Sequence, residues 1–565
     1  MTRPVALIGA EFEENLSLRY LAAAIEAHGF VAEIVPFHDP AEAGAVVARV
    51  AALDPLVVGI SVPFQLRARE FLGLAQSLRA AGSRAHIVAG GHFATFEYDN
   101  IMREFPAVDS IVRHEGEHTL IELCSRLRDG TAVAGIAGTL TRAPDGIVDG
   151  GTRRLAPLDE LPYPDRRGEP HEVMGVPASP IVGSRGCYAD CAFCCIYAYA
   201  ENADGARYRR RSPENVAEEM RREYVERGVR LFIFHDDNFF VPSAKLNIAR
   251  YSRLQELLDG YGMNDIALVI KCRPNDVDPE LFGLLKRMGM IRAYVGIETN
   301  SDEGIVSLNR RITSQDNRRA LTVFRDLDIY CSYNVLIFDP EATLDGVTRN
   351  LDFMHGFSDV PFNFCRAEVY AGTPLKQILE RQGRLKGDWF AWGYEMRDPQ
   401  VEVLFRIAIT AFGARNFKHD GVANLNLGIR FDHEVVRHFY PDASDPAWHG
   451  RLVDFSTRVG HDSIALMREA HAFVSAEDIY DSARVKAFTL DLARRVARAD
   501  LGFVGECKRL RREMEQRVVT RADDRGRRVW SRGMPPWAAE SFRLGSSVGR
   551  ELSTERLPAP GRLAI

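Results

Sequence analysis

Short, continuous apolar runs alternate with amphipathic stretches in two separate parts of this 565-residue chain. The first part, residues 1–128, contains five such runs, at 5–10, 32–37, 56–62, 86–91 and 110–114. Apolar strands joined by helices predict a parallel sheet that is covered on both faces. We therefore expect a doubly wound, flavodoxin-like (Rossmann-like) domain of the α/β class, whose ligands bind beyond the carboxyl ends of the strands.

The second part repeats this alternation with six apolar runs, at 179–184, 230–235, 266–272, 293–299, 332–338 and 364–370. A helical pattern follows each run. Six β/α units are too few for the eight of a closed TIM barrel. The sequence thus predicts an open, partial (β/α)6 TIM-like barrel, with its chemistry at the carboxyl ends of the strands.

The remaining segments set the expected domain boundaries. Residues 129–178 are rich in Gly, Pro and Asp, which predicts a small hairpin and then a linker. Apolar residues recur at helical spacing from 481 to 519, and no strand pattern is present after 385. We expect an N-terminal domain (1–150), a linker (151–178), the partial barrel (179–384) and a mostly helical C-terminal region (385–565), whose tail is poorly ordered from about 520.

Composition argues against several classes of protein. The 72 basic and 78 acidic residues give a net charge of −6, which is no sign of a nucleic-acid or membrane-surface partner. No apolar run is long enough to span a membrane, and the N-terminus soon turns acidic, unlike a signal peptide. We therefore expect a cytoplasmic protein. In a reducing compartment, nine clustered cysteines point to metal binding or catalysis rather than disulfides.

Three cysteines lie at the spacing CxxxCxxC, Cys187, Cys191 and Cys194, and Cys195 follows directly. Thiolates bind soft metals, so the candidates are iron–sulfur and zinc. A structural zinc site usually takes four ligands from two separated pairs, whereas this group is compressed into one loop after the first barrel strand. Three ligands suit a [4Fe–4S] cluster with one iron left open; zinc or packed thiols are the alternatives. Cys195 is expected to pack, because adjacent cysteines rarely reach one metal without strain.

CxxxCxxC after the first strand of a partial barrel resembles the radical S-adenosylmethionine (SAM) superfamily. The resemblance implies that Cys187, Cys191 and Cys194 hold the cluster and that the amino and carboxylate groups of SAM chelate the open iron. Reductive cleavage of SAM in that family gives a 5′-deoxyadenosyl radical, which abstracts hydrogen from a substrate.

The ends of the next two strands offer further matches to that family. Asp236 and Asp237 follow the second strand, where the family binds the ammonium group of SAM; a carboxylate suits a cation there. Asp237 could equally cap a helix. At the third strand, the side chains suited to the SAM carboxylate are Lys271, Arg273 and Asn275.

The fourth and fifth strands complete the expected SAM site. Glu298 ends the fourth strand, where the family contacts the ribose hydroxyls. Leu336 lies in the loose adenine-binding motif of the fifth strand, although Asn334 and Phe338 replace both glycines of that motif. Backbone contact with the adenine is therefore the expectation there.

A doubly wound domain before such a barrel resembles the cobalamin-binding subgroup of the superfamily. The loop after the first strand lacks the histidine that binds cobalt in many cobalamin domains, so we expect a cobalamin without a protein histidine ligand, with residues 63–67 near its lower face. No GxGxxG follows that strand, which argues against a dinucleotide, and a domain that binds nothing is the other alternative. The residues expected to contact cobalamin are Asn15, Ser61, Gly90, Gly91, Glu115 and Gly116.

Three features outside these motifs have ordinary explanations beside functional ones. Cys331 and Cys365 lie on barrel strands and are expected to pack. The basic run 207–216 contains a helix start, SPEN, and its arginines are expected to be solvated or to face a cofactor. The aromatic and histidine residues of 419–442 are candidates to line a substrate pocket.

The resemblance implies a cobalamin-dependent radical SAM enzyme that transfers a methyl group from methylcobalamin to an unactivated carbon, in natural-product biosynthesis. Its cofactors would be a [4Fe–4S] cluster, SAM and cobalamin. Its partners would be a small-molecule or peptide substrate and an electron donor such as flavodoxin or ferredoxin. Rearrangement or cyclisation without methyl transfer, a radical SAM enzyme without cobalamin, and a non-catalytic iron–sulfur or cobalamin sensor are the alternatives.

Overall fold

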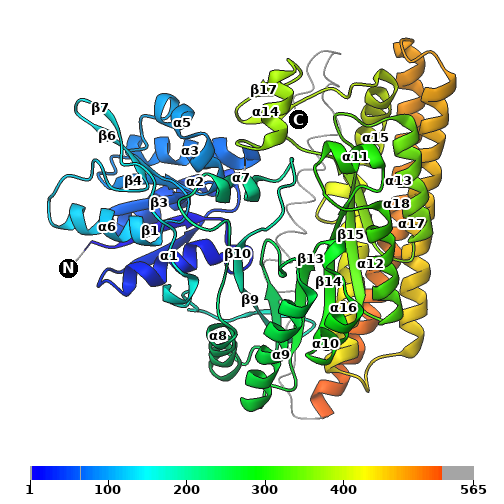
Figure 1. The fold of residues 1–565 in the computed structure, drawn as a ribbon, viewed down its shortest axis with the longest axis horizontal. Coiled ribbons are helices and arrows are strands. Elements are labelled where there is room, and N and C mark those ends of the chain that lie inside the picture. Colours follow the sequence, from blue (N-terminus) through cyan, green and yellow to red (C-terminus); the bar gives the residue numbers. More distant parts are fainter. Residues whose placement is uncertain (1–2, 64, 525–565) are drawn as a thin grey trace.

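A computed structural model describes residues 3–63 and 65–524, with side chains described as far as 518. The N-terminal sheet lies on one side of the molecule, the second sheet lies in the middle, and long C-terminal helices cover the opposite side (Figure 1). The last helix continues to Asp524, so it includes the first residues of the tail predicted to be poorly ordered. The rest of that tail, 525–565, lies outside the described residues.

The N-terminal sheet has the strand order β2-β1-β3-β4-β5-β6-β7, and its first five strands are parallel. This confirms the doubly wound, flavodoxin-like fold. Helices α1 and α6 pack on one face of the sheet and α2 and α3 on the other, because each strand presents apolar side chains to both faces. The strands are β1 (Val5–Gly9), β2 (Ala32–Pro36), β3 (Val57–Ser61), β4 (His86–Gly90) and β5 (Ser110–Val112). The helices are α1 (Leu16–Glu26), η1 (Pro40–Glu42), α2 (Ala43–Leu53), α3 (Gln65–Ala80), α4 (His92–Phe96), α5 (Tyr98–Glu104) and α6 (Glu117–Arg128).

The hairpin predicted after residue 129 is formed by β6 (Thr139–Ala143) and β7 (Gly146–Asp149), and it extends the same sheet in the antiparallel direction. From β1 the chain adds β2 on one side of the sheet and then β3, β4 and β5 on the other, so the order of the strands reverses between the neighbours β1 and β3. In doubly wound folds this switch point is where ligands bind.

The second sheet has the order β16-β15-β14-β13-β12-β9-β8, with six parallel strands, which confirms the partial barrel. The seventh strand, β8 (His171–Val173), is antiparallel and was not predicted, because three residues carry no readable alternation. The parallel strands are β9 (Val176–Ile181), β12 (Leu231–Phe234), β13 (Ala267–Cys272), β14 (Met290–Glu298), β15 (Tyr330–Phe338) and β16 (Phe362–Arg366). A separate antiparallel pair is formed by β10 (Ser184–Gly186) and β11 (Tyr208–Arg210).

Helices follow the barrel strands as the sequence predicts. The SPEN segment starts α8, with Ser212 as its N-cap and Pro213 in its first turn. The elements of this part are η2 (Leu158–Glu160), α7 (Cys195–Glu201), α8 (Pro213–Glu226), α9 (Ala244–Gly260), η3 (Pro274–Asp276), α10 (Pro279–Arg287), α11 (Asp302–Ser307), α12 (Ser314–Asp326), α13 (Leu344–Gly356) and α14 (Pro374–Arg381).

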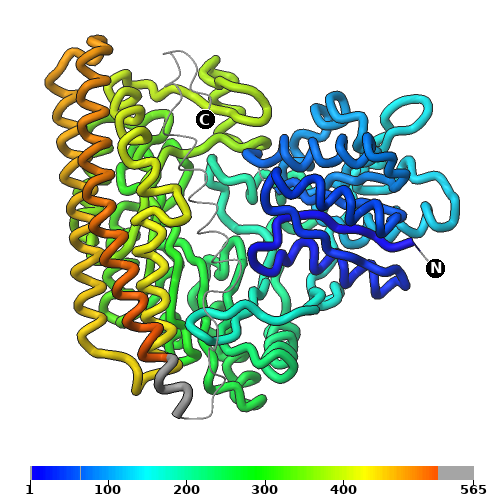
Figure 2. The backbone as a smooth tube through the Cα atoms, turned by 180° about the vertical axis from the view of Figure 1, so that it is seen from behind, coloured from blue at the N-terminus to red at the C-terminus, as the bar shows by residue number. Residues whose placement is uncertain are grey.

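The C-terminal region is helical, as predicted, apart from a short hairpin. That hairpin, β17 (Lys386–Asp388) and β18 (Ala391–Gly393), corrects the expectation of no strand after 385; its short strands lack an apolar face. The helices are α15 (Pro399–Phe417), α16 (Val422–Phe439), α17 (Pro446–Ala476) and α18 (Ser482–Asp524). Both views show α17 and α18 along the side away from the N-terminal sheet (Figures 1 and 2).

A buried ion-pair network joins the two sheets through the linker. Arg166 of the linker pairs with Glu14, just before α1, and lies 2.6 Å from Glu219 of α8. Arg227 lies 2.5 Å from the same Glu14. Removing one partner of such a buried pair leaves an uncompensated charge, so each member of this network depends on the contact between the two parts of the chain.

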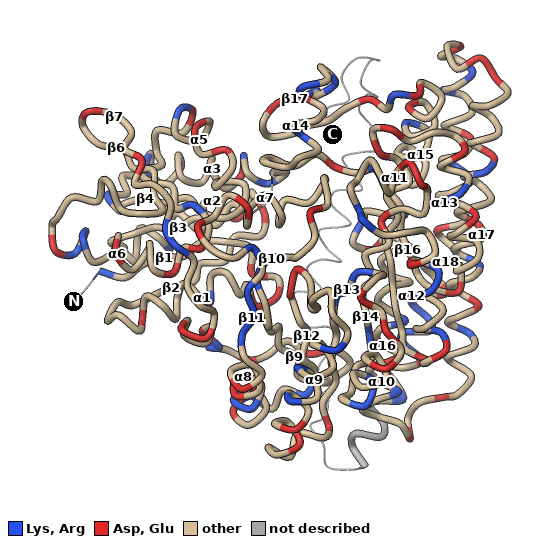
Figure 3. Tube along the Cα trace, in the orientation of Figure 1, with Lys and Arg blue, Asp and Glu red and all other residues tan. Residues whose placement is uncertain are grey.

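Charges elsewhere are mixed in sign along the described trace (Figure 3). Among the described helices, none combines the length and hydrophobicity needed to cross a bilayer.

Candidate active site

The cysteine loop is held in place by contacts from distant parts of the barrel. The backbone N–H of Ala192 donates to the Leu308 carbonyl (2.9 Å), and that of Leu375 donates to Ala192 (2.8 Å). The Tyr188 hydroxyl donates to Asp276 beyond β13 (2.6 Å). Cys194 is the N-cap of α7, and Cys195 is the first residue of that helix. The loop is therefore preformed at the carboxyl end of the barrel sheet.

Two guanidinium groups point at one cysteine sulfur. Arg273 Nη1 lies 3.0 Å and Arg310 Nη1 3.2 Å from the Sγ atom of Cys191. Both arginines are buried. Such donors stabilise a thiolate, since hydrogen bonds to an ionised acceptor are the strong ones. Sequence reasoning assigned Arg273 to SAM and missed Arg310, which no local motif distinguishes.

The thiols fit a polynuclear cluster better than one ion. Burial raises the pKa of Cys187 to about 11, so this thiol becomes a thiolate only when a cation binds. Within the described residues, the Sγ atoms of Cys187, Cys191 and Cys194 do not all lie within 4.8 Å of one another. Two sulfurs on one zinc ion lie at most about 4.6 Å apart, since each Zn–S bond is about 2.3 Å. The spacing favours iron–sulfur over zinc.

The two aspartates after β12 have different surroundings. Asp236 is buried and accepts hydrogen bonds from the Ser184 hydroxyl (2.5 Å) and the Gly183 N–H (2.9 Å). Asp237 accepts from the Gly186 N–H (3.0 Å) and lines the cavity described below. Burial raises the pKa of both carboxyls to about 6. The helix that follows is capped by Ser243, so Asp237 is not its N-cap.

Glu298 has an unusual backbone at the end of β14. Its φ angle is 63°, in the left-handed region that side chains other than glycine seldom adopt, and the β14–β15 register shifts there. Burial raises the pKa of its carboxyl, against the attraction of Arg310 and Arg273. Strain of this kind collects at ligand sites. Leu336, the residue expected near adenine, is buried in β15 and pairs in register with Cys365.

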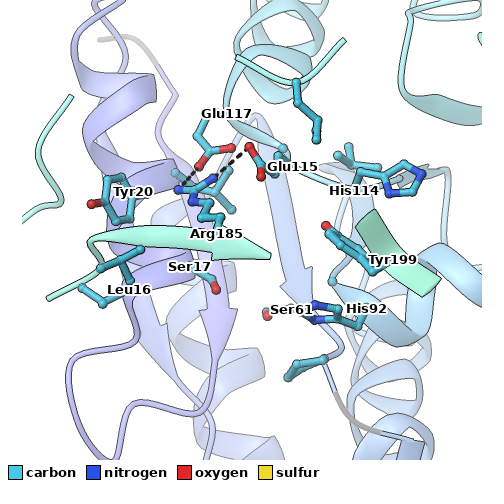
Figure 4. Close-up of a pocket in the computed structure, with 18 of the residues that line it drawn as sticks. Leu16, Ser17, Tyr20, Ser61, His92, His114, Glu115, Glu117, Arg185 and Tyr199 are labelled. Carbon is cyan, nitrogen blue, oxygen red and sulfur yellow. Dashed lines mark hydrogen bonds and ion pairs between the residues drawn. The ribbon is translucent and has the colours of Figure 1, made fainter. Parts of the chain in front are cut away.

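A cavity of about 280 Å³ lies between the two sheets, at the switch point between β1 and β3. Side chains from both domains form its walls (Figure 4). Arg185, next to the cysteine loop, is held between Glu115 (3.1 Å) and Glu117 (2.7 Å) of the N-terminal domain. The part of the cavity that the strands line is apolar, with residues such as Leu7, Ile60, Val88 and Val112.

Five of the six residues expected to contact cobalamin line this cavity: Ser61, Gly90, Gly91, Glu115 and Gly116. Gly91 has a φ of 103°, and a side chain there would meet the Val62 carbonyl oxygen at 3.0 Å. The sixth, Asn15, caps α1: it accepts from the Leu18 N–H (3.4 Å) and donates to the Ala10 carbonyl (2.8 Å). An apolar groove with glycines at its rim fits a bulky, flat cofactor that approaches the backbone closely.

Three histidines that sequence reasoning did not assign also line the cavity: His92, His114 and His235. The ring of Tyr199, on α7, lies between those of His92 (centroids 4.2 Å apart) and His114 (5.0 Å), as Figure 4 shows. Burial lowers the pKa of His92 and His114 to about 4. The Nδ1 atom of His114 is buried and has no hydrogen-bond partner among the described groups. His92 directly follows Gly90–Gly91, and His114 directly precedes Glu115 and Gly116; these positions were the available signals.

The other cysteines, the basic run and the segment 419–442 lie in three different surroundings. Cys124, Cys272, Cys331 and Cys507 are buried, as expected of packing residues, and Cys365 is half-buried. Arg207 and Arg209 of the basic run face the cavity. Residues 419–442 form mainly α16, and none of them lines the cavity.

Two family models match the chain in this order. Residues 7–124 match the B12 binding domain, and residues 181–346 match the radical SAM superfamily. The first range contains the strands and the Gly90–Gly91 pair of the cavity. The second begins at the end of β9 and includes the three cysteines.

Three named relatives match part of the chain at 25–28% identity. An uncharacterized methyltransferase of Pyrococcus horikoshii is 28% identical over 64% of this chain and 77% of its own length. A hopanoid C-3 methylase of Methylococcus capsulatus is 28% identical over 51% of this chain. An anaerobic magnesium-protoporphyrin IX monomethyl ester cyclase of Rubrivivax gelatinosus is 25% identical over 52%. The chain spans about half the length of the last two, 54% and 53%.

Two solved structures share the fold. The cobalamin-dependent SAM radical enzyme OxsB, with aqua-cobalamin and SAM bound, has a TM-score of 0.66 and 16% identity, over 98% of this chain and 85% of its own. The radical SAM methyltransferase TsrM from Kitasatospora setae, with cobalamin and a [4Fe–4S] cluster bound, has a TM-score of 0.56 and 20% identity, over 67% and 75%. The chain thus joins a B12 binding domain to a radical SAM domain, with a cavity between them, and the cofactors that these two domains indicate are cobalamin, a [4Fe–4S] cluster and SAM.

Proposed function

We propose that the protein transfers a methyl group, carried by cobalamin, to an unactivated carbon of a small-molecule or peptide substrate. The proposal rests mainly on the position of α7, which contributes residues both to the cysteine loop and to the cavity. Its N-cap is Cys194, and Ile196, Tyr199 and Ala200 of the same short helix line the cavity. A cluster on the cysteine loop and a cobalamin in the cavity would thus be neighbours.

When bound, the cluster and SAM supply the hydrogen-abstracting radical, and cobalamin supplies the methyl group. The chain's own residues position these groups. In the proposed SAM site, Asp237 contacts the ammonium group and Glu298 contacts the ribose. Asp236 positions the segment after β9, since it accepts hydrogen bonds from Gly183 and Ser184. Arg273 holds Cys191 and lies where the SAM carboxylate is expected.

The cavity walls support the cobalamin half of the proposal. Ser61 and Gly90 end the neighbouring strands β3 and β4 beside the switch point, Gly91 follows β4, and the apolar side chains of the cavity suit the nucleotide tail of cobalamin. The ion pairs of Arg185 with Glu115 and Glu117 join the domains across this wall. Contacts between the domains at this wall would help to limit the access of water to a radical reaction.

The test is turnover with SAM that carries a deuterated methyl group. Reconstituted enzyme and candidate substrates are incubated anaerobically with a reductant, and products are identified by mass spectrometry. Methyl transfer predicts a labelled product together with S-adenosylhomocysteine and 5′-deoxyadenosine. A product without label, formed with no S-adenosylhomocysteine, would refute methyl transfer.

The second candidate is cyclisation or rearrangement without methyl transfer. It is favoured by the similarity to the magnesium-protoporphyrin cyclase, which is about as strong as that to the hopanoid methylase. The same assay separates the two, since cyclisation gives 5′-deoxyadenosine alone.

We further propose a cytoplasmic location and a flavodoxin- or ferredoxin-type electron donor, because the cluster needs a low-potential reductant. The proposed division of the chain is 1–150, 151–178, 179–384 and 385–565.

A further inference from the structure

A second group of metal-binding side chains lies on the C-terminal helices. His433 and Glu434 are on α16, and His449 is in the first turn of α17. One ligand atom from each lies within 4.8 Å of the other two. His433 and Glu434 are 1% and 3% exposed, so this is no solvated surface cluster. None of the three residues lines the cofactor cavity.

The carboxylate of Glu434 is oriented by its neighbours. Its Oε1 atom lies 3.3 Å from His433 Nδ1, and its Oε2 atom lies 2.7 Å from Arg437. Arg437 also pairs with Asp328 (3.0 Å), so its charge is shared between two carboxylates. A hydrogen-bonded partner on the far oxygen is the usual support of a metal-binding carboxylate. Oε1 is thereby directed towards the histidines.

His449 is the residue that hydrogen bonding leaves unexplained. Its Nδ1 atom is buried and has no hydrogen-bond partner in the described structure. The contact between His433 and Glu434 gives each of those two side chains a hydrogen-bond partner, but it leaves the Nδ1 atom of His449 without one. A cation among the three would satisfy all of them.

We propose that His433, Glu434 and His449 bind one zinc ion, with water at the fourth position. Two imidazoles and one carboxylate form a donor set that zinc accepts in proteins. The group lies near the amino ends of the barrel strands: the Tyr330 hydroxyl, at the start of β15, donates to the Leu427 carbonyl of α16 (2.9 Å). This is the end of the barrel away from the cysteine loop. The ion therefore ties α17 to α16 and stabilises the C-terminal region, with no part in the radical chemistry.

The test uses the full chain with its cluster reconstituted, so that the cluster cysteines are occupied. Zinc is added, loosely bound metal is removed by dialysis, and zinc and iron are counted by mass spectrometry. We expect about one zinc per chain and a zinc-dependent rise in the thermal midpoint, since a ligand that binds only the folded state stabilises it. His449→Ala should lower the retained zinc at least ~10-fold and abolish that rise, with iron unchanged.

The matched control is His461→Ala, which removes an exposed histidine from the same helix and should retain zinc as the wild type does. Glu434→Gln, which keeps the shape of the side chain, serves if His449→Ala fails to fold. A wild type that retains no zinc and shows no thermal shift overturns the proposal. Equal zinc in the wild type, His449→Ala and Glu434→Gln also overturns it, because the metal would then be bound elsewhere.

Discussion

The Nη1 atom of Arg310 lies 3.2 Å from the Sγ atom of Cys191, although 119 residues separate the two in sequence. Arg273 donates to the same sulfur from the end of β13 (3.0 Å). Two positive charges on one cluster ligand stabilise the more negative, reduced state of the cluster. The arginines thus connect the geometry of the loop with the redox step that starts the proposed reaction.

Arg310→Ala should leave the cluster assembled but lower its reduction potential. Loss of one charged donor destabilises the reduced state, and a shift on the order of 60 mV corresponds to a tenfold change in the one-electron equilibrium. A redox titration followed by electron paramagnetic resonance measures it. The control is Arg311→Ala, which removes a mostly exposed neighbour paired with Asp190. An unchanged potential in Arg310→Ala would contradict the role given to this contact.

Cys194→Ser should abolish the brown colour of the cluster and SAM cleavage, whereas Cys195→Ser should leave both largely intact. Cys194 ends the loop as the N-cap of α7, and Cys195 lies inside that helix. Iron and sulfide analysis after anaerobic reconstitution distinguishes the variants. If Cys195→Ser also loses its iron, the assignment of three ligands is wrong.

Glu298→Gln should weaken SAM binding about 10- to 100-fold, because a hydrogen bond to a charged group contributes about 1.5–3 kcal/mol. Equilibrium dialysis with labelled SAM measures the affinity. Iron content should not change, since Glu298 is not a cluster ligand. Glu303→Gln, on the neighbouring α11, is the control. Equal affinity in Glu298→Gln and wild type would remove Glu298 from the SAM site.

The free energy of unfolding of the cofactor-free chain should fall as the pH drops from 6.5 to about 4. His92 and His114 have pKa values of about 4 in the folded state, below the ordinary value of 6.5. The unfolded state therefore takes up protons first, and each histidine removes up to roughly 3 kcal/mol across this window. Urea denaturation at several pH values measures the slope.

His92→Gln should flatten that pH dependence, whereas His28→Gln, at the exposed end of α1, should leave it unchanged. If the unfolding free energy of His92→Gln depends on pH as strongly as that of the wild type, burial does not keep His92 neutral.

Sequence predicted those parts of the site that depend on local spacing. The cysteines share one loop, and the strand ends that carry Ser61, Gly90 and Glu298 follow readable apolar runs. Arg310 could not be found in this way, because its role depends on a turn between two helices that meets the cysteine loop only in the folded chain. His92 and His114 lay beside recognised motifs, but their burial against Tyr199 depends on how the two domains pack.

The C-terminal region shows the same limit. Residues 419–442 have the aromatic and histidine content of a pocket wall, and in the folded chain the apolar side chains of α16 pack against the face of the barrel strands opposite the face that α8–α13 cover. The β17–β18 hairpin has too few residues to show an alternating pattern.

The most direct test of the central claim is to quantify two products of SAM in one anaerobic assay, with and without hydroxocobalamin. The account predicts 5′-deoxyadenosine that depends on Cys187, Cys191 and Cys194, and S-adenosylhomocysteine that forms only when cobalamin is bound. Formation of 5′-deoxyadenosine with no cobalamin-dependent S-adenosylhomocysteine would contradict it.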